Sequence, residues 1–289
     1  SPDETFDPRI HIGFYRYAAI TQFVDDKNKE QYERRNLTVE SITRRLKRIM
    51  QILLVKRLES SLVAFKATLD NLYRYNDVMI DMLEHDCVYI CPDIDINKIH
   101  KEHPGDFDGF QAEVEALIAR KGGKNRRFKA SDFKDSYLGD LENDRLLIAA
   151  LLRRWNANTE DPKFDRFKEA IKPELFDPEI NNPSGKNRPR LVIFTEALDT
   201  LKSLERALKA RGHKVLSITA KNRDEMQRVI EANFDANCKA ELQRDDYDVI
   251  VTTEVLAEGV NLHRANVILN YDTPWNATRL MQRIGRVNR

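Results

Sequence analysis

Hydrophobic residues change their spacing along this chain near residue 190. From Ser41 to about His85, apolar residues recur every three to five positions among lysines and arginines, which predicts helix. We expect a break between two helices at Asn76. The same spacing over residues 110–120 and 138–156 predicts two further helices. A coiled-coil seam is an alternative for the first stretch, but heptads are not sustained, so packing against another domain fits better.

The stretch from Asp161 to Arg190 differs from what precedes it, because it carries five prolines and the turn Asn182-Pro183-Ser184-Gly185. This composition is typical of a linker. We therefore expect a mostly helical region over residues 1–182 and a second domain over residues 183–289.

Beyond the linker, short apolar runs alternate with amphipathic segments. The runs at 190–195, 213–219, 247–253 and 265–271 suit strands buried on both faces. The segments between the first three, about 197–211 and 223–234, have the apolar spacing of helices. Alternation of this kind predicts an α/β fold, with a parallel sheet covered by helices on both faces.

Hydroxyl groups occur where several of these predicted strands end. The hydroxyl residues are Thr195, Thr219, Thr252 and Thr253. The last predicted strand is followed by a carboxylate instead, that of Asp272. Ligands of open α/β sheets bind beyond the carboxyl ends of the strands. These positions therefore predict a phosphate-lined cleft.

The last stretch carries arginines at 279, 283, 286 and 289, which fall along one side of a predicted helix. The guanidinium fork is planar, permanently charged and matched to phosphate oxygens. A solvated basic face is the ordinary alternative. Gly285 inside the row favours the phosphate hypothesis, because a small residue there allows a ligand or backbone to come close.

Composition restricts the partners of the chain. Its formal net charge is only +1, so contact with nucleic acid must come from local basic clusters. One such cluster, Arg120–Lys129, holds six basic residues and two glycines. It fits a mobile phosphate-contacting loop or a solvated insertion equally well.

The chain shows no membrane or secretory signal. No run approaches the roughly 18 apolar residues of a membrane span, and the polar start is not a signal peptide. The three cysteines lack a repeated CxxC pattern and fit reduced thiols, so a cytoplasmic protein is expected. A metal site at Cys87 and Cys91 is disfavoured, because Val88–Ile90 between them suits a strand.

Residues from about 190 to 289 resemble the second RecA-like domain of superfamily-two helicases and translocases, a domain of the P-loop NTPase type. Leu191–Thr195 resembles the fourth motif of this family, and Thr252–Asn261 the fifth. Gln282–Arg289 matches the sixth, Q-R-x-G-R-x-x-R. Gly259–Leu262 resembles the Swi/Snf-type form, and Leu53–Ser61 resembles a helix that lies between the two motor domains of bacterial Swi/Snf-like helicases.

The resemblance implies roles for individual residues. Arg286 and Arg289 would act as arginine fingers on the ATP γ-phosphate, and Gln282 would sense that phosphate or the attacking water. The residues implied at the nucleotide are Gly259, Asn261, which replaces the usual aspartate, and Arg283. The residues implied at nucleic-acid phosphates are Thr195, Thr219, Thr252 and Thr253.

Two motor motifs are not found in these 289 residues. No G-x-x-x-x-G-K-[ST] phosphate loop occurs, and the acidic sequence Asp224–Gln227 opens a predicted helix rather than ending a buried strand. The resemblance thus implies that ATP and Mg²⁺ are held mainly by a missing first RecA-like domain in cis. We expect a piece of a longer protein that does not hydrolyse ATP alone.

The favoured nucleic-acid partner is double-stranded DNA. An RNA-directed helicase is one alternative, because residues that grip phosphate do not read the sugar. The other is a non-catalytic module, in which the helical half binds a protein and the α/β half docks.

Overall fold

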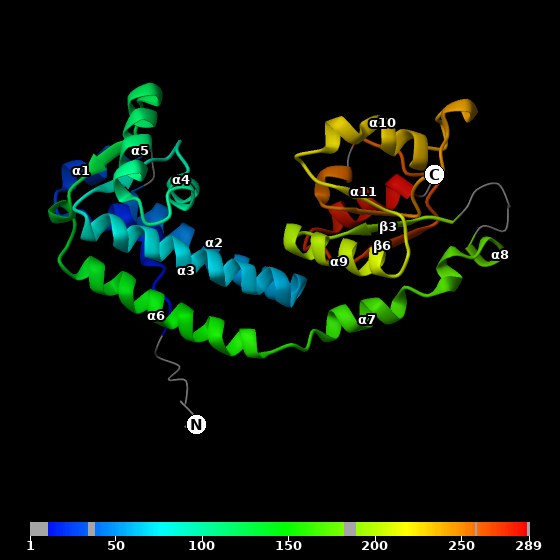
Figure 1. Cartoon of the computed structure of the whole chain (residues 1–289), viewed down its shortest axis with the longest axis horizontal. Coiled ribbons are helices and arrows are strands. Elements are labelled where there is room, and N and C mark those ends of the chain that lie inside the picture. Colours follow the sequence, from blue (N-terminus) through cyan, green and yellow to red (C-terminus); the bar gives the residue numbers. More distant parts are fainter. Residues whose placement is uncertain (1–10, 34–37, 182–188, 258, 288–289) are drawn as a thin grey trace. The chain divides into compact units, whose positions relative to one another are not determined.

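A computed structural model describes residues 11–33, 38–181, 189–257 and 259–287 of the chain (Figure 1). The chain divides into two compact units, Ser1–Val55 with Thr68–Asn158, and Lys56–Ala67 with Thr159–Arg289. The second unit thus starts earlier than the expected boundary after residue 182. It also takes in a short segment from the middle of the helical region.

The first unit is mostly helical, as its apolar spacing predicts. Its elements are η1 (Tyr15–Gln22), α1 (Asp26–Glu30), α2 (Val39–Ser60), α3 (Leu62–Glu84), β1 (Val88–Ile90), α4 (Ile96–Glu102), α5 (Phe107–Lys121), β2 (Arg126–Phe128), η2 (Ala130–Asp132) and α6 (Ser136–Ala157). The last residues of α2 and the first of α3 belong to the second unit.

The helix break predicted at Asn76 is wrong, since α2 gives way to α3 at Ser61. Asn76 lies buried inside α3, where its Nδ2 donates to the Leu72 carbonyl over 2.9 Å. An amide that bonds back one turn is compatible with an uninterrupted helix.

Strand β1, expected from the Val88–Ile90 run, pairs antiparallel with β2, and Val88 lies opposite Phe128. The basic stretch Arg120–Lys129 therefore runs from the end of α5 into a strand. All three cysteines are free thiols. Within the described ranges, no group of three or more His, Cys, Asp or Glu residues could hold a metal, and no helix is long and apolar enough to span a membrane.

The second unit is an α/β domain. Its remaining elements are α7 (Pro162–Ala170), η3 (Pro173–Phe176), α8 (Pro178–Asn181), β3 (Leu191–Phe194), α9 (Leu198–Ala210), β4 (Val215–Ile218), α10 (Arg223–Phe234), η4 (Ala240–Leu242), β5 (Val249–Thr252), η5 (Glu254–Leu256), β6 (Val267–Asn270) and α11 (Ala277–Val287). All four strands are parallel, in the order β4-β5-β3-β6. The predicted α/β, RecA-like architecture is confirmed.

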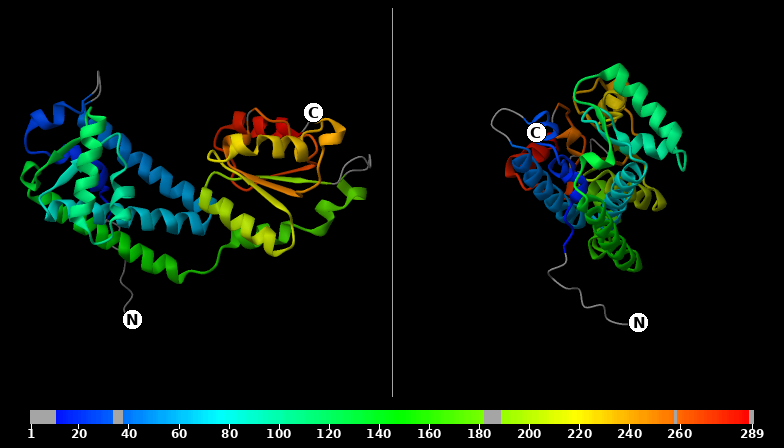
Figure 2. Two further views of the ribbon diagram at one scale, coloured as in Figure 1. Left: turned by 45° about the horizontal axis from the view of Figure 1, so that its top comes forward. Right: turned by 90° about the vertical axis from the view of Figure 1, so that its left-hand side faces the viewer.

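Both faces of this sheet are covered, which explains the uninterrupted apolar runs of its strands. Side chains alternate between faces along a strand. Leu191 and Ile193 of β3 pack in one cluster with leucines of α9, while Val192 and Phe194 pack in another with Phe234 of α10. Figure 2 shows α9 on one side of the sheet and α10 with α11 on the other.

The proline-rich stretch 161–190 is not simply a linker, because it contains α7. Pro162 is the first residue of this helix, where a backbone N–H is not needed. Asp161 caps the helix by accepting from the Phe164 N–H over 3.0 Å. Phe167 is 5% exposed and joins the cluster beneath the sheet. Part of the expected linker is therefore core of the second unit.

Two buried arginines hold the loop that precedes β5. Arg190 and Arg264 both form ion pairs with Asp245, and both donate to the Arg244 carbonyl, over 3.3 and 3.0 Å. Their side chains are 0% and 5% exposed, whereas that of Asp245 is 61% exposed. The guanidinium of Arg190 also lies 5.7 Å from the centre of the Phe234 ring.

Replacing the shared carboxylate tests this arrangement. Asp245→Ala leaves two buried arginines without their shared carboxylate, and we expect the free energy of unfolding to fall by about 2 kcal/mol. This is below the cost for a fully buried pair, because water reaches Asp245. Asp246→Ala, at the exposed neighbouring residue, should cost less than about 0.5 kcal/mol. Urea unfolding followed by circular dichroism measures both, and equal midpoints for the two variants would contradict the role of Asp245.

Candidate functional site

The strand ends of the second unit meet at one edge of the sheet. Phe194 of β3 is in register with Thr252 of β5 and with Asn270 of β6, and Ile218 of β4 is also in register with Thr252. Because the strands are parallel, the residues that follow them emerge together. The structure thus brings the predicted hydroxyl positions and Asp272 to the same edge.

Two of the four predicted threonines turn their side chains inward. Thr195 and Thr252 are both 0% exposed. Thr195 Oγ1 donates to Asp272 Oδ2 over 2.6 Å, and Thr252 Oγ1 donates to the Thr253 carbonyl over 3.0 Å. Thr219 and Thr253 are partly exposed, and Thr219 Oγ1 donates to Asn222 Oδ1 over 3.2 Å. The nucleic-acid contacts of these threonines stay predictions, and the exposed pair is the better placed.

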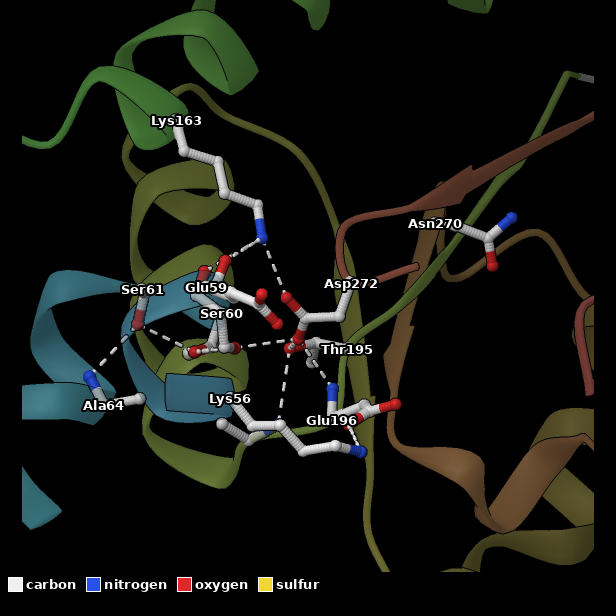
Figure 3. Close-up of polar contacts among 12 residues, drawn as sticks. Lys56, Glu59, Ser60, Ser61, Ala64, Lys163, Thr195, Glu196, Asn270 and Asp272 are labelled. Carbon is white, nitrogen blue, oxygen red and sulfur yellow. Dashed lines mark hydrogen bonds and ion pairs between the residues drawn. The ribbon is translucent and has the colours of Figure 1, made fainter. Parts of the chain in front are cut away.

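The carboxylate of Asp272 is the most heavily bonded group at this edge (Figure 3). Its Oδ2 accepts from Thr195 Oγ1, from the Glu196 N–H over 2.7 Å and from Ser60 Oγ over 2.8 Å. Its Oδ1 accepts from Lys163 Nζ over 2.8 Å. Burial raises the pKa of Asp272, but the hydrogen bonds from Lys163, Thr195 and Glu196 outweigh it and hold the pKa below its usual value.

The arginine row on α11 is not uniformly exposed. Arg279 is exposed, Arg286 is half-buried, and Arg283 is fully buried. Arg289 lies outside the described residues. Arg283 Nη1 donates to Asn270 Oδ1 and to the Asp272 carbonyl, both over 2.8 Å.

Further partners fix the Arg283 guanidinium inside the unit. Its Nη2 pairs with Glu254, and the group lies 5.0 Å from the centre of the Phe194 ring. Burial lowers the pKa of Arg283 from its usual value, and the charge of Glu196 acts in the opposite direction. Among the described arginines of the row, the phosphate-facing hypothesis therefore applies best to Arg286, whereas the exposed Arg279 fits the alternative of a solvated basic face. The nucleotide contact of Arg283 stays a prediction. In the structure its guanidinium is bonded to groups within the protein.

The segment with Gly259 and Asn261 runs beside α11, because the Leu262 N–H donates to the Arg286 carbonyl over 2.9 Å. Gly259 has φ +74°, and a Cβ there would lie 2.7 Å from Arg223 Nη2. The positive φ favours glycine here, whereas the Arg223 guanidinium, at the end of a flexible side chain, could move aside for a Cβ. Asn261 and Gln282 are partly exposed, and the nucleotide contacts of Gly259, Asn261 and Gln282 stay predictions.

Three further residues contribute to this edge without having been expected there, namely Ser60, Lys163 and Glu254. They lie in α2, α7 and η5, far from one another in sequence. Ser60 lies within Leu53–Ser61 and Glu254 within Thr252–Asn261, two stretches that resemble helicase segments, but neither resemblance indicates these contacts. For Lys163 we find no sequence signal.

Residues 168–289 match the family model described as "Helicase conserved C-terminal domain". The probable ATP-dependent RNA helicase ddx51 of Dictyostelium discoideum is 26% identical over 110 residues, which cover 38% of this chain and 19% of that protein. The uncharacterized ATP-dependent helicase YqhH of Bacillus subtilis is 49% identical over 49 residues, or 17% of this chain and 9% of that protein. The solved helicase domain of Hef from Pyrococcus furiosus aligns with a TM-score of 0.34 at 20% identity, over 76% of this chain and 39% of that one.

The chain spans only 19% and 9% of the length of these two curated relatives. The family match nevertheless covers the described sheet from β3 to β6 and all of α11. It includes the three stretches that resemble helicase motifs. Residues 168–289 of this chain are therefore similar to the conserved C-terminal domain of helicases.

Proposed function

We propose that the intact protein is an ATP-dependent helicase or translocase and that residues 168–289 supply the second of its two RecA-like motor domains. The observation that carries this proposal is the setting of Arg286. It lies half-buried on α11, three residues after an arginine that is locked into the sheet edge. Its carbonyl is also bonded to the segment that follows Gly259. The match to the helicase family and the ATP-dependent activity in the names of both relatives support it further.

The chemistry of phosphoryl transfer explains why such an arginine matters. Charge spreads over the oxygens of the transferred phosphoryl group, and a guanidinium brought up to it stabilises the transition state. We assign this role to Arg286 and Arg289. Gln282 lies one turn before Arg286 and is partly exposed, so it suits contact with the phosphate or the attacking water. ATP and Mg²⁺ would be bound mainly by the first motor domain.

We further propose double-stranded DNA as the substrate, moved by a translocase of the Swi/Snf-like type. Two resemblances support this, Leu53–Ser61 and Gly259–Leu262. The partly exposed Thr219 and Thr253 are the threonines best placed for phosphate contacts. RNA is the second candidate, favoured by a specific observation: ddx51 and several other relatives are named RNA helicases.

The arginine-finger role predicts a selective loss of turnover. In the intact protein, Arg286→Ala should lower kcat for nucleic-acid-stimulated ATP hydrolysis by about 10³-fold or more. Arg279→Ala, at an exposed arginine of the same helix, should leave kcat close to wild type. Steady-state phosphate release measures both variants. Turnover by Arg286→Ala at the wild-type rate would contradict the role.

The 289-residue chain by itself should show no measurable ATP hydrolysis, because its sequence contains no G-x-x-x-x-G-K-[ST] phosphate loop. The measurement is phosphate release with and without duplex DNA and Mg²⁺. DNA-stimulated turnover that Arg286→Ala abolishes would show that the chain carries a complete ATPase site and would overturn this part of the proposal.

Substrate choice can be decided with the intact protein. We expect duplex DNA to stimulate ATP hydrolysis more than duplex or single-stranded RNA of the same length and sequence. Strand-displacement and translocation assays on the same substrates separate unwinding from movement along an intact duplex. Stronger stimulation by RNA would favour the second candidate. If no nucleic acid stimulates hydrolysis, the chain is better explained as a docking module.

A further inference from the structure

The α2–α3 junction, residues Lys56–Ala67, is part of the second unit. Hydrogen bonds fix the backbone where α2 ends and α3 begins. Ser61 Oγ accepts from the Ala64 N–H over 3.0 Å, as the N-cap of α3. Asp161 Oδ2 accepts from the Leu62 N–H over 3.1 Å. Both bonds satisfy donors that the first turn of α3 would otherwise leave without partners.

The two serines of the junction form a buried hydroxyl network with the sheet domain. Ser60 Oγ donates to Asp272 Oδ2 over 2.8 Å and lies within 2.8 Å of Thr200 Oγ1. Ser61 Oγ lies 2.7 Å from the same threonine oxygen. All four side chains are less than a tenth exposed. Buried polar groups that lose a partner carry a desolvation penalty, so this network resists displacement of the junction.

Lys163 adds a second connection between the junction and Asp272. Its Nζ donates to the Glu59 carbonyl over 2.7 Å and to the Ser60 carbonyl over 3.1 Å. These are among the last carbonyls of α2, which lack partners within the helix and favour a cation. The same ammonium group donates to Asp272 Oδ1. One lysine therefore ties the end of α2 to the Asp272 carboxylate.

Lys56 makes a separate contact one turn earlier on α2. Its Nζ lies 3.3 Å from Glu196 Oε2 and 4.7 Å from the centre of the Trp275 ring. Glu196 follows the end of β3, and Trp275 precedes α11 by two residues. Lys56 and Glu196 are partly exposed and Trp275 is exposed, so we assign these contacts a smaller contribution than those of Ser60 and Lys163.

The main chain of Asp272 is also bonded to α11, the helix that carries the arginine row. Its carbonyl accepts from Arg283 Nη1, and the same guanidinium binds Asn270 and Glu254. The side chain of Asp272 is thus bonded to the α2–α3 junction, while its backbone is bonded to α11. Asp272 cannot move away from one without disturbing the other.

We infer that the α2–α3 junction positions α11 through Asp272, and that Ser60 and Asp272 are positioning residues for this helix. The geometric chain runs from Ser60 through Asp272 to Arg283, three residues before Arg286. The consequence for ATP hydrolysis rests on the proposed function, because it requires Arg286 to act on the nucleotide. A displacement of about 1 Å can cost a catalytic group about 10²-fold in rate, so a support of this kind matters.

Hydrogen exchange on the 289-residue chain tests the structural part without ATP. In Ser60→Ala and in Asp272→Asn, amides of residues 277–287 should exchange about 10-fold faster, while those of β3 keep their wild-type rates. Ser203→Ala, at a half-buried serine of α9 in the same unit, should leave α11 unchanged. Unchanged exchange in α11 of Ser60→Ala would overturn the inference. So would an equal increase in α11 and β3, which indicates general destabilisation.

The catalytic part is tested in the intact protein. Ser60→Ala should lower kcat for ATP hydrolysis about 10-fold with KM for ATP little changed, because the nucleotide is held mainly elsewhere. A wild-type kcat in Ser60→Ala, beside an inactive Arg286→Ala, would overturn the inference and leave the proposed function intact. An intact wild-type protein that hydrolyses no ATP would instead overturn the proposed function, while the exchange result would still decide whether the junction positions α11.

Discussion

The buried carboxylate of Asp272 is the constraint on which the functional edge of the second unit depends. Removing a carboxylate from water costs several kcal/mol unless hydrogen bonds and a counter-charge replace the lost hydration. Here the replacements come from Ser60, Lys163, Thr195 and the Glu196 amide. These donors belong to widely separated parts of the sequence. Bonds to this one carboxylate therefore attach the α2–α3 junction and α7 to the sheet domain.

Asp272 also connects the α2–α3 junction with α11. Helix α11 carries the candidate catalytic arginine, and Arg283 attaches it to the sheet edge through the Asp272 carbonyl. The segment after β5 joins it through Glu254 and through the bond from Leu262 to Arg286. The stretches that resemble the fifth and sixth helicase motifs thus form one bonded assembly, which the junction supports from the other side of Asp272.

Much of the second unit could be predicted from its sequence, because each strand of a sheet covered on both faces is a short apolar run. The elements from β3 to α11 follow that pattern. The prediction was wrong where local signals have two explanations. Pro162 suggests a break, yet at the first position of α7 it favours the helix. Asn76 also suggests a break, yet its side chain bonds within α3. The true break at Ser61 depends on capping contacts that come partly from Asp161, 99 residues from Leu62.

The location of the candidate site could be predicted from the sequence, but the directions of its side chains could not. Parallel strands place Thr195, Thr252 and Asp272 at one edge whatever their partners. Whether a hydroxyl there faces a ligand or the interior depends on distant residues, and Thr195 turns inward to a carboxylate 77 positions away. Spacing alone likewise put Arg283 in a row with Arg286, while the acceptors Asn270 and Glu254 draw its guanidinium into the unit.

The most direct test of the account is kcat for ATP hydrolysis by the intact protein carrying Arg286→Ala, measured beside Arg279→Ala. The account predicts that only the first variant loses turnover, since Arg286 is held by the bonded assembly around Asp272 while Arg279 lies exposed on the same helix. Equal turnover by the two variants would contradict it.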